Sequence, residues 1–146
     1  MSRLDKIGGW VQLFPFERPD LMTADRNILG EPLQPCSMDP LTGWFRDGCC
    51  TADPNDQGRH LVCAIVTDEF LAFSKEVNND LTRARPEYGF AGLKPGDRWC
   101  LCADRWEEAR QAGCAPPVVL EATNARATEV VALGHLQAFA AEDAEF

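Results

Sequence analysis

Two adjacent cysteines are the most unusual chemical feature of this sequence. Cys49 and Cys50 follow Arg46-Asp-Gly48 in a stretch without periodicity, and His60 stands at the start of the next apolar run. A free thiol with a pKa near 8.5 is only about 3% ionised at pH 7, so a nucleophilic cysteine needs a nearby positive charge. Arg46 or His60 could provide it. Cys49, Cys50 and His60 are therefore the candidate catalytic residues for nucleophilic or redox chemistry, and the alternative is that both thiols fill gaps beneath an irregular loop.

The other five cysteines offer weaker patterns: Cys36, Cys63, Cys100, Cys102 and Cys114. Cys100 and Cys102 would share one face of a strand, where they could hold a soft metal or pack as small hydrophobic residues. His60 and Cys63 would point to opposite faces unless His60 precedes the strand. The sequence contains no C-x-x-C pair from which a zinc ribbon could be built. We therefore expect no resident metal and no cofactor, and we interpret all seven cysteines as thiols.

A second kind of site is suggested by arginine and tryptophan in the loops. Arg suits planar, two-pronged contacts with carboxylates and phosphates, and tryptophan rings stack on guanidinium groups. The candidate ligand-binding residues are Trp44, Arg46, Asp97, Arg98 and Trp99. Further basic and aromatic candidates in or beside the loops are Arg83, Arg85, Arg105 and Trp106. The alternatives are local ion pairs and, for Asp97, a structural role in the Lys94-Pro-Gly-Asp97 turn.

The elements that must position these residues are short. Apolar runs predict strands at 60–66, 98–102 and 117–121, and capping residues predict helices at 68–77 and 104–111. A helical turn near 125–128, an extended stretch at 130–133 and a helix at 134–140 complete the prediction. Residues 27–59 and 81–96 are rich in Pro and Gly and predict irregular connections. The fold class is α+β, with a small mixed sheet, helices packed on it and a long irregular N-terminal third; the alternative is α/β.

The two long connections carry aromatic residues that favour burial. We expect the segments 36–59 and 81–96 to pack together beside the strand that contains Cys100. Aromatic residues at 44, 45, 88 and 90 would then be buried, with about 2 kcal/mol gained for each.

Length and charge limit the function further. The 146 residues suit one domain at 27–141, with an N-terminal leader or edge segment at 1–26 and an acidic tail at 142–146. A net charge of −9 argues against binding to nucleic acids or to anionic membranes. No apolar run approaches the ~18 residues of a membrane span, and the N-terminus lacks the apolar core of a secretory signal. We expect a cytoplasmic protein.

Several long, ungapped stretches resemble a known bacterial family. They are Asn27-Ile-Leu-Gly-Glu-Pro-Leu-Gln-Pro-Cys36, Asp39-Pro-Leu-Thr-Gly-Trp-Phe-Arg-Asp-Gly-Cys-Cys50, His60-Leu-Val-Cys63, Thr67-Asp-Glu-Phe-Leu71 and Gly89-Phe-Ala-Gly-Leu-Lys-Pro-Gly-Asp-Arg-Trp-Cys-Leu-Cys102. The chain resembles, from about Asn27 to Leu136, the family catalogued as domain of unknown function 2237. Asn78 stands where this family tends to have Gly, and Asn tolerates a left-handed backbone almost as well. The resemblance implies an intact domain of a cytosolic family and assigns no catalytic residue.

Two functions follow from these patterns. The first is a small cytosolic binding module, in which an Arg/Trp-lined loop pocket takes a small anionic ligand or a partner segment. The second is a thiol-centred protein with a redox or nucleophilic cysteine at 49/50, or with a thiolate metal site. The sequence shows no obvious pair of base and nucleophile, which favours the binding module and leaves open whether the chain is an enzyme.

Overall fold

The computed structural model describes residues 25–141 and confirms the α+β fold class. Strands β2 (His60–Ile65) and β3 (Arg98–Cys102) pair antiparallel, with Cys63 opposite Cys100 and Ala64 opposite Trp99. Both strands have apolar, largely buried centres, as expected for strands covered on both faces. The predicted leader and acidic tail lie outside the described residues, apart from the last two positions of the leader.

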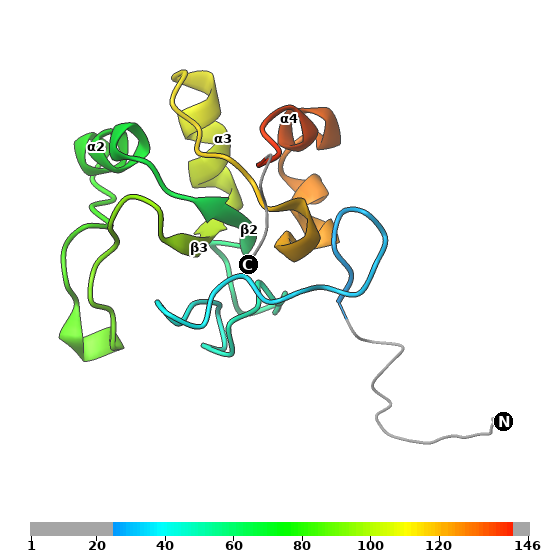
Figure 1. Cartoon of the computed structure of the whole chain (residues 1–146), viewed down its shortest axis with the longest axis horizontal. Coiled ribbons are helices and arrows are strands. Elements are labelled where there is room, and N and C mark those ends of the chain that lie inside the picture. Colours follow the sequence, from blue (N-terminus) through cyan, green and yellow to red (C-terminus); the bar gives the residue numbers. More distant parts are fainter. Residues whose placement is uncertain (1–24, 142–146) are drawn as a thin grey trace, which may run out of the picture.

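Three α-helices cover one side of this pair of strands: α2 (Asp68–Glu76), α3 (Ala103–Gln111) and α4 (Leu133–Ala138). In the view of Figure 1 they lie above the strands, and the irregular segment 25–59 runs below them. Thr67 caps α2, because its hydroxyl oxygen accepts a hydrogen bond from the Phe70 backbone N–H at 3.0 Å. Asn78 follows that helix with φ of 64°, the left-handed conformation expected where the family has Gly.

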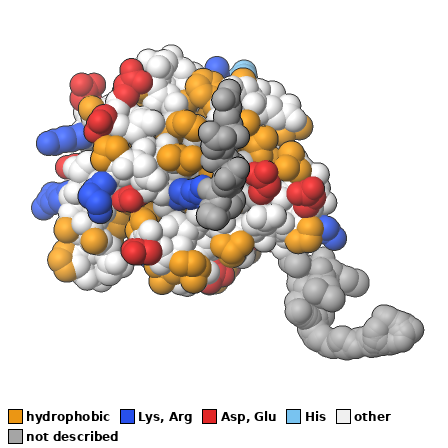
Figure 2. All heavy atoms as spheres, in the orientation of Figure 1, with side chains coloured by type: hydrophobic (Ala, Val, Ile, Leu, Met, Phe, Trp, Pro, Cys, Tyr) orange, Lys and Arg blue, Asp and Glu red, His pale blue; other side chains and the backbone are white. Residues whose placement is uncertain are grey.

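The main apolar core lies between the helices and the strands. It includes the fully buried Phe70, Leu101, Trp106, Val118 and Leu136. Trp106 packs its ring edge-on against Phe139, with centroids 5.5 Å apart, and its indole N–H donates to the Pro116 carbonyl at 3.0 Å. Figure 2 shows that charged side chains of both signs and hydrophobic patches alternate on one face of the molecule. Within residues 25–141, no helix is long and apolar enough to cross a membrane.

The predicted strand at 117–121 does not form. Val118 makes only isolated bridges, antiparallel to Ala64 and parallel to Ala140. The chain then turns into a 3-10 helix, Leu120–Ala122, and a second 3-10 helix follows at Ala125–Glu129. The Thr123 hydroxyl donates to the Val119 carbonyl at 2.9 Å and accepts from the Cys63 N–H. One bond within the turn and one from β2 therefore replace the longer ladder that the β-branched sequence predicted. The stretch at 130–133 likewise leads into α4 instead of forming a strand.

The segment 25–59 contains no helix and no strand of two or more residues among its described positions, as the sequence predicted. Buried polar side chains hold it in place. Asn27 accepts from the N–H groups of Leu29 and Glu31, both at 2.9 Å, and donates to the Glu121 carbonyl at 3.0 Å. The buried Thr42 hydroxyl accepts from the Cys100 N–H at 2.9 Å, which joins this segment to β3.

The expected burial of the loop aromatics is mostly wrong. Trp44, Phe45 and Tyr88 keep 41%, 52% and 68% of their surface exposed, and only Phe90 is half-buried. The connection 81–96 contains a short 3-10 helix, Pro86–Tyr88, that ends at Gly89 in a left-handed conformation. The aromatic rings therefore line an open surface instead of filling a core.

Candidate functional site

Four cysteines gather in one buried cluster, which we call the cysteine cluster: Cys36, Cys50, Cys63 and Cys100. Cys36 is bonded to Cys63, and Cys50 is bonded to Cys100. This corrects the interpretation that all seven cysteines are thiols. Each bond joins the irregular segment 25–59 to one of the two strands, in which Cys63 and Cys100 lie opposite each other.

The three remaining cysteines, Cys49, Cys102 and Cys114, are half-buried thiols. Burial and the neighbouring Asp47 carboxylate raise the pKa of the Cys49 thiol above its usual value. Burial likewise raises the pKa of Cys102. The pKa of the Cys49 thiol is therefore raised, whereas the activated nucleophile that the sequence suggested requires a lowered pKa. Cys50 is already in a disulfide. Cys102 and Cys100, expected on one strand face, do not share a site, because Cys100 is bonded to Cys50.

An open groove of about 650 Å³ lies beside the cysteine cluster. We call it the aromatic groove. Its lining comes from the loop after Cys36, the start of β2, the residues that follow α2, the connection 81–96 and strand β3: Gly43, Trp44, Arg46, His60, Asn78, Asn79, Asp80, Leu81, Arg85, Tyr88, Phe90, Trp99 and Cys100. The segments 36–59 and 81–96 thus meet beside Cys100, as the sequence predicted.

Arg46 lies over the floor of this groove. Its guanidinium carbon is 5.4 Å from the centroid of the Trp99 ring, and its Nη1 donates to the Gly43 carbonyl at 2.7 Å. Trp99 in turn packs against Phe90, with centroids 5.0 Å apart. Stacking on an aromatic face and one backbone hydrogen bond hold the guanidinium in a fixed plane. That bond occupies one of its five donors.

His60 adds an imidazole ring to the groove lining. It stacks on Trp44, with ring centroids 6.4 Å apart. The buried Asp56 carboxylate fixes the ring, since its oxygens accept from the His60 backbone N–H at 2.9 Å and contact Nδ1 at 2.7 Å. Such a carboxylate partner orients an imidazole and favours a proton on Nδ1. His60 therefore begins β2 and contributes to the groove, while its predicted partner Cys63 is bonded to Cys36.

The groove lining also includes a carboxylate, that of Asp80. Asp80 accepts hydrogen bonds from the backbone N–H and the hydroxyl of Thr82, at 3.0 and 2.6 Å. These bonds, the side-chain bond first, lower the pKa of the Asp80 carboxyl below its usual value, so it is ionised at neutral pH. The groove therefore combines two arginines, Arg46 and Arg85, with one negative group.

Several sequence-predicted ligand residues lie outside the groove lining. Asp97 closes the turn that the sequence also allowed, because its carboxylate accepts from the Lys94 N–H at 2.8 Å. Arg98 belongs to β3, and burial lowers the pKa of its guanidinium. Arg105 pairs with Glu108 at 3.1 Å, and Trp106 is in the core. Of the predicted ligand residues, the structure brings together Trp44, Arg46 and Trp99, with the further candidate Arg85.

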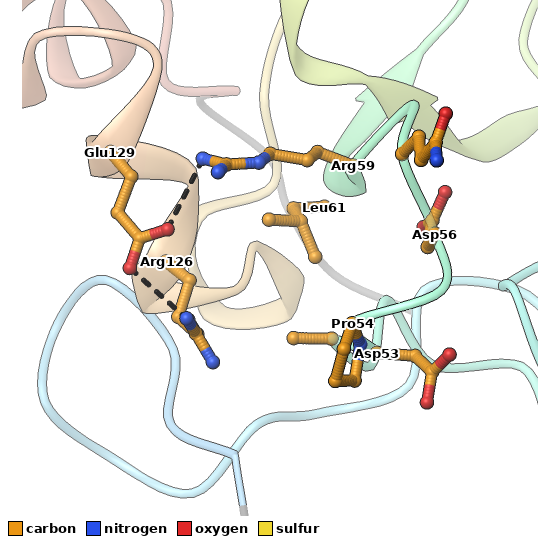
Figure 3. A pocket seen from close by; sticks show the side chains of 9 residues that line it. Asp53, Pro54, Asp56, Arg59, Leu61, Arg126 and Glu129 are labelled. Atoms are coloured by element: carbon orange, nitrogen blue, oxygen red, sulfur yellow. Dashed lines mark hydrogen bonds and ion pairs between the residues drawn. The ribbon is translucent and has the colours of Figure 1, made fainter.

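A second cavity of about 360 Å³, the charged cavity, lies on another part of the surface. Figure 3 shows Arg59 and Arg126 both reaching Glu129, with Leu61 between the two sides. Each arginine is 3.2 Å from a different Glu129 oxygen. Asp53 and Asp56 add further negative charge, so carboxylates within the cavity neutralise the positive charge of the two arginines. The charged cavity is therefore a poorer anion site than the aromatic groove.

Sequence reasoning missed Asp56, Asp80, Tyr88 and Phe90 as parts of the site. The spacing Asp56-x-x-x-His60 is a usable signal for a carboxylate that orients a histidine, although a loop gives it no fixed geometry. Asp80 with Thr82 fits the pattern of a local side-chain turn. The cluster of four cysteines had no signal, because its members are far apart in the sequence.

The fold and site define a small α+β domain with an aromatic groove beside a buried cysteine cluster. Residues 26–140 match the model of a family described as an uncharacterised protein conserved in bacteria, domain of unknown function 2237. The match spans more than half of the chain, which therefore belongs to this family and confirms the resemblance. A search of curated proteins finds no match.

Proposed function

We propose that this protein is a binding module that takes a small organic anion in the aromatic groove. The observation that carries the proposal is the position of Arg46, held over the Trp99 ring by stacking and by its bond to Gly43. A guanidinium fixed in this way loses little conformational freedom when it binds a carboxylate or a phosphate.

The rest of the lining supports the same ligand class. Trp44, Tyr88 and Phe90 provide apolar surface, and the exposed aromatic rings gain from being covered by a planar ligand. Arg85 and His60 add two further polar groups to the lining. Pockets for small molecules commonly combine apolar walls with a few fixed polar groups of this kind.

Asp80 narrows the choice of anion. Its ionised carboxylate in the same groove repels a multiply charged ligand and favours a singly charged one, particularly one that also carries a hydrogen-bond donor. We therefore expect an aromatic or apolar carboxylate to fit better than inorganic phosphate.

Calorimetric titration with benzoate and with its uncharged analogue benzamide tests this proposal. We expect benzoate to bind with one site per chain and benzamide to bind at least about tenfold more weakly, since a hydrogen bond to a charged group contributes about 1.5–3 kcal/mol. Arg46→Gln should weaken benzoate binding by the same factor and leave benzamide nearly unaffected.

Arg83→Gln is the matched control, because Arg83 is an exposed arginine of the connection 81–96 that is not part of the groove lining. It should leave benzoate binding unchanged. Equal affinity for the two probes, an equal loss in both variants, or no saturable heat with either probe would refute the proposal.

The alternative function, a nucleophilic or redox thiol at 49/50, stays a prediction with less support. The raised pKa of Cys49 predicts alkylation by iodoacetamide with a midpoint above the usual value for a thiol. A fast-reacting thiol with a midpoint well below pH 8 would favour this alternative over the binding module.

A further inference from the structure

We propose that the cysteine cluster is also a metal site: after reduction, Cys36, Cys50, Cys63 and Cys100 hold one divalent ion of the zinc type as four thiolates. This inference is independent of the anion-binding proposal. It rests on where the four sulfur atoms lie and on what surrounds them.

The four sulfur atoms form one cluster although they come from four places in the chain. The Sγ atoms of Cys36, Cys50 and Cys100 lie within 4.8 Å of one another, and the sulfur of Cys63 is bonded to that of Cys36. In a tetrahedral site with Zn–S bonds of about 2.3 Å, the sulfur atoms are about 3.8 Å apart. Three of the sulfurs are therefore already near the spacing of a tetrahedral site, and the sulfur of Cys63, which is bonded to that of Cys36, must turn toward them once the two S–S bonds are broken.

The backbone of the cluster is already organised for this role. Cys63 and Cys100 lie opposite each other in the two strands, which fixes half of the site. Cys36 and Cys50 are held on the other side: the Cys36 N–H donates to the Gly48 carbonyl at 2.7 Å, and the Cys50 carbonyl accepts from the Asn124 side chain at 2.9 Å. Rigid strands combined with anchored loops hold ligands in place without the ion.

The surroundings favour a closed structural site over a catalytic one. All four cysteines are at most 2% exposed, and they pack with Val119 and Ala122. Four sulfur ligands with no open position are typical of structural zinc, and thiolates are the soft ligands that zinc prefers. An uncompensated thiolate would be costly in these apolar surroundings, so deprotonation is favourable only when the ion binds.

Reduction of both disulfides comes before metal binding. Two molecules of a dithiol reductant each give two electrons and two protons to one S–S bond, and each becomes a cyclic disulfide. The protein then holds four thiols. One divalent ion forms four metal–sulfur bonds and displaces four protons to solvent. In the cytoplasm, where thiols are kept reduced, the ion would replace the two disulfides as the link between the irregular segment and the strands.

The test uses the full chain and Co²⁺ as a spectroscopic probe. The protein is reduced with dithiothreitol, freed of the reductant without air, and titrated with Co²⁺. We expect one ion per chain, with the thiolate-to-cobalt charge-transfer absorption and the strong visible bands of tetrahedral Co²⁺. Zn²⁺ should displace the bound Co²⁺. Loading of the reduced, metal-free protein with Zn²⁺ should release protons to the solvent. The unreduced protein should show none of these bands.

The matched control is the triple variant Cys49→Ser, Cys102→Ser, Cys114→Ser, which removes the three half-buried thiols and keeps the cluster. It should give the same spectrum and stoichiometry. Cys36→Ser should weaken Co²⁺ binding by more than about tenfold, the loss that even an outer-shell substitution can cause. The proposal fails if the reduced wild-type chain shows no tetrahedral thiolate spectrum, or if the triple variant loses it. Those two results do not depend on the folding of Cys36→Ser.

Discussion

The segment before β2 and the part of the chain from β2 onward are held in different ways. Nearly all large buried apolar side chains, among them Phe70, Leu101 and Trp106, come from residues 60–141. The segment 25–59 contributes Cys36 and Cys50 to the buried apolar set, together with the buried polar side chains Asn27, Thr42 and Asp56. One region therefore has a core, and the other is attached to it by two disulfides and by hydrogen bonds.

This difference explains where the candidate sites lie. A segment without its own core can present Trp44 and Arg46 on its surface, because its position is fixed from beneath by links to β2 and β3. Binding residues on loops commonly depend on a rigid scaffold in this way. The groove therefore depends on these links, and substitutions in the two regions should have different effects.

Removing one of the links should have the largest effect. We expect the double variant Cys50→Ala, Cys100→Ala to lower the free energy of unfolding by about 4 kcal/mol, the chain-entropy estimate for a bond that spans 50 residues. Denaturant unfolding without reductant measures the loss, and hydrogen exchange should rise mainly at 25–59. Cys114→Ala, at a half-buried free thiol, is the control and should cost less than about 1 kcal/mol. Uniformly faster exchange over the whole chain would contradict the division into two regions.

A cavity in the apolar core should destabilise the region 60–141. Leu101 is 2% exposed at the centre of β3, and Leu101→Ala should lower the free energy of unfolding by about 3 kcal/mol. Hydrogen exchange should then rise throughout 60–141. Leu133→Ala is the matched control, since Leu133 is 41% exposed, and it should change stability by less than about 1 kcal/mol. A comparable loss at both positions would mean that the apolar core does not carry this region.

Loss of one of the hydrogen bonds between the two regions should give a smaller effect. Thr42→Val keeps the shape of the buried side chain but leaves the Cys100 N–H without its acceptor, at a cost of about 1–2 kcal/mol. Because Thr42 precedes Trp44 and Arg46, benzoate binding should weaken as well. Thr128→Val removes only an exposed hydrogen bond to the Ala125 carbonyl, so it should cost less than about 1 kcal/mol and leave benzoate binding unchanged. Unchanged benzoate affinity in Thr42→Val would show that the groove does not depend on this bond.

The smallest effect concerns an ion pair on α3, outside the segment 25–59 and its links. The hydrogen bond from Arg110, at 2.6 Å, lowers the pKa of the Glu107 carboxyl below its usual 4.5. A lowered folded-state pKa means that the stabilisation is present above the unfolded pKa and is lost as the pH falls through the folded one. The difference in thermal stability between wild type and Glu107→Gln should thus be under about 1 kcal/mol at neutral pH and shrink below about pH 4. A difference that grows on acidification would contradict this, and Glu87→Gln, at an exposed position, should show no such change.

Local sequence determined much of the scaffold. The run His-Leu-Val-Cys-Ala-Ile and the segment Arg98–Cys102 form the predicted strands, because β-branched and apolar side chains suit a buried pair of strands. Thr67 caps the predicted helix α2, and Asn124 begins the predicted turn near 125 through its bond to the Arg126 N–H. These signals act within a few residues, so they do not require knowledge of the rest of the fold.

The third strand shows where local signals fail. Val118 and Val119 favour a strand, yet Val119 donates to the Cys63 carbonyl and its own carbonyl accepts from the Thr123 hydroxyl, which bends the chain into a 3-10 helix. Tertiary partners decided between two conformations that both suit the sequence.

Types and spacing of residues suggested an Arg/Trp pocket, and Trp44, Arg46 and Trp99 do meet in the aromatic groove. Only the tertiary structure shows that Arg46 lines the groove while Arg98 and Asp97 lie outside it. Asp97 closes a turn and Arg98 lies on strand β3, so their side chains have different surroundings from that of Arg46. The cysteines show the same limit more clearly. Cys36 and Cys63 are 27 residues apart, and Cys50 and Cys100 are 50 apart, so no local pattern pairs them. Their sulfur atoms meet because the strand register places Cys63 opposite Cys100, and a register is set by the packing of the whole domain.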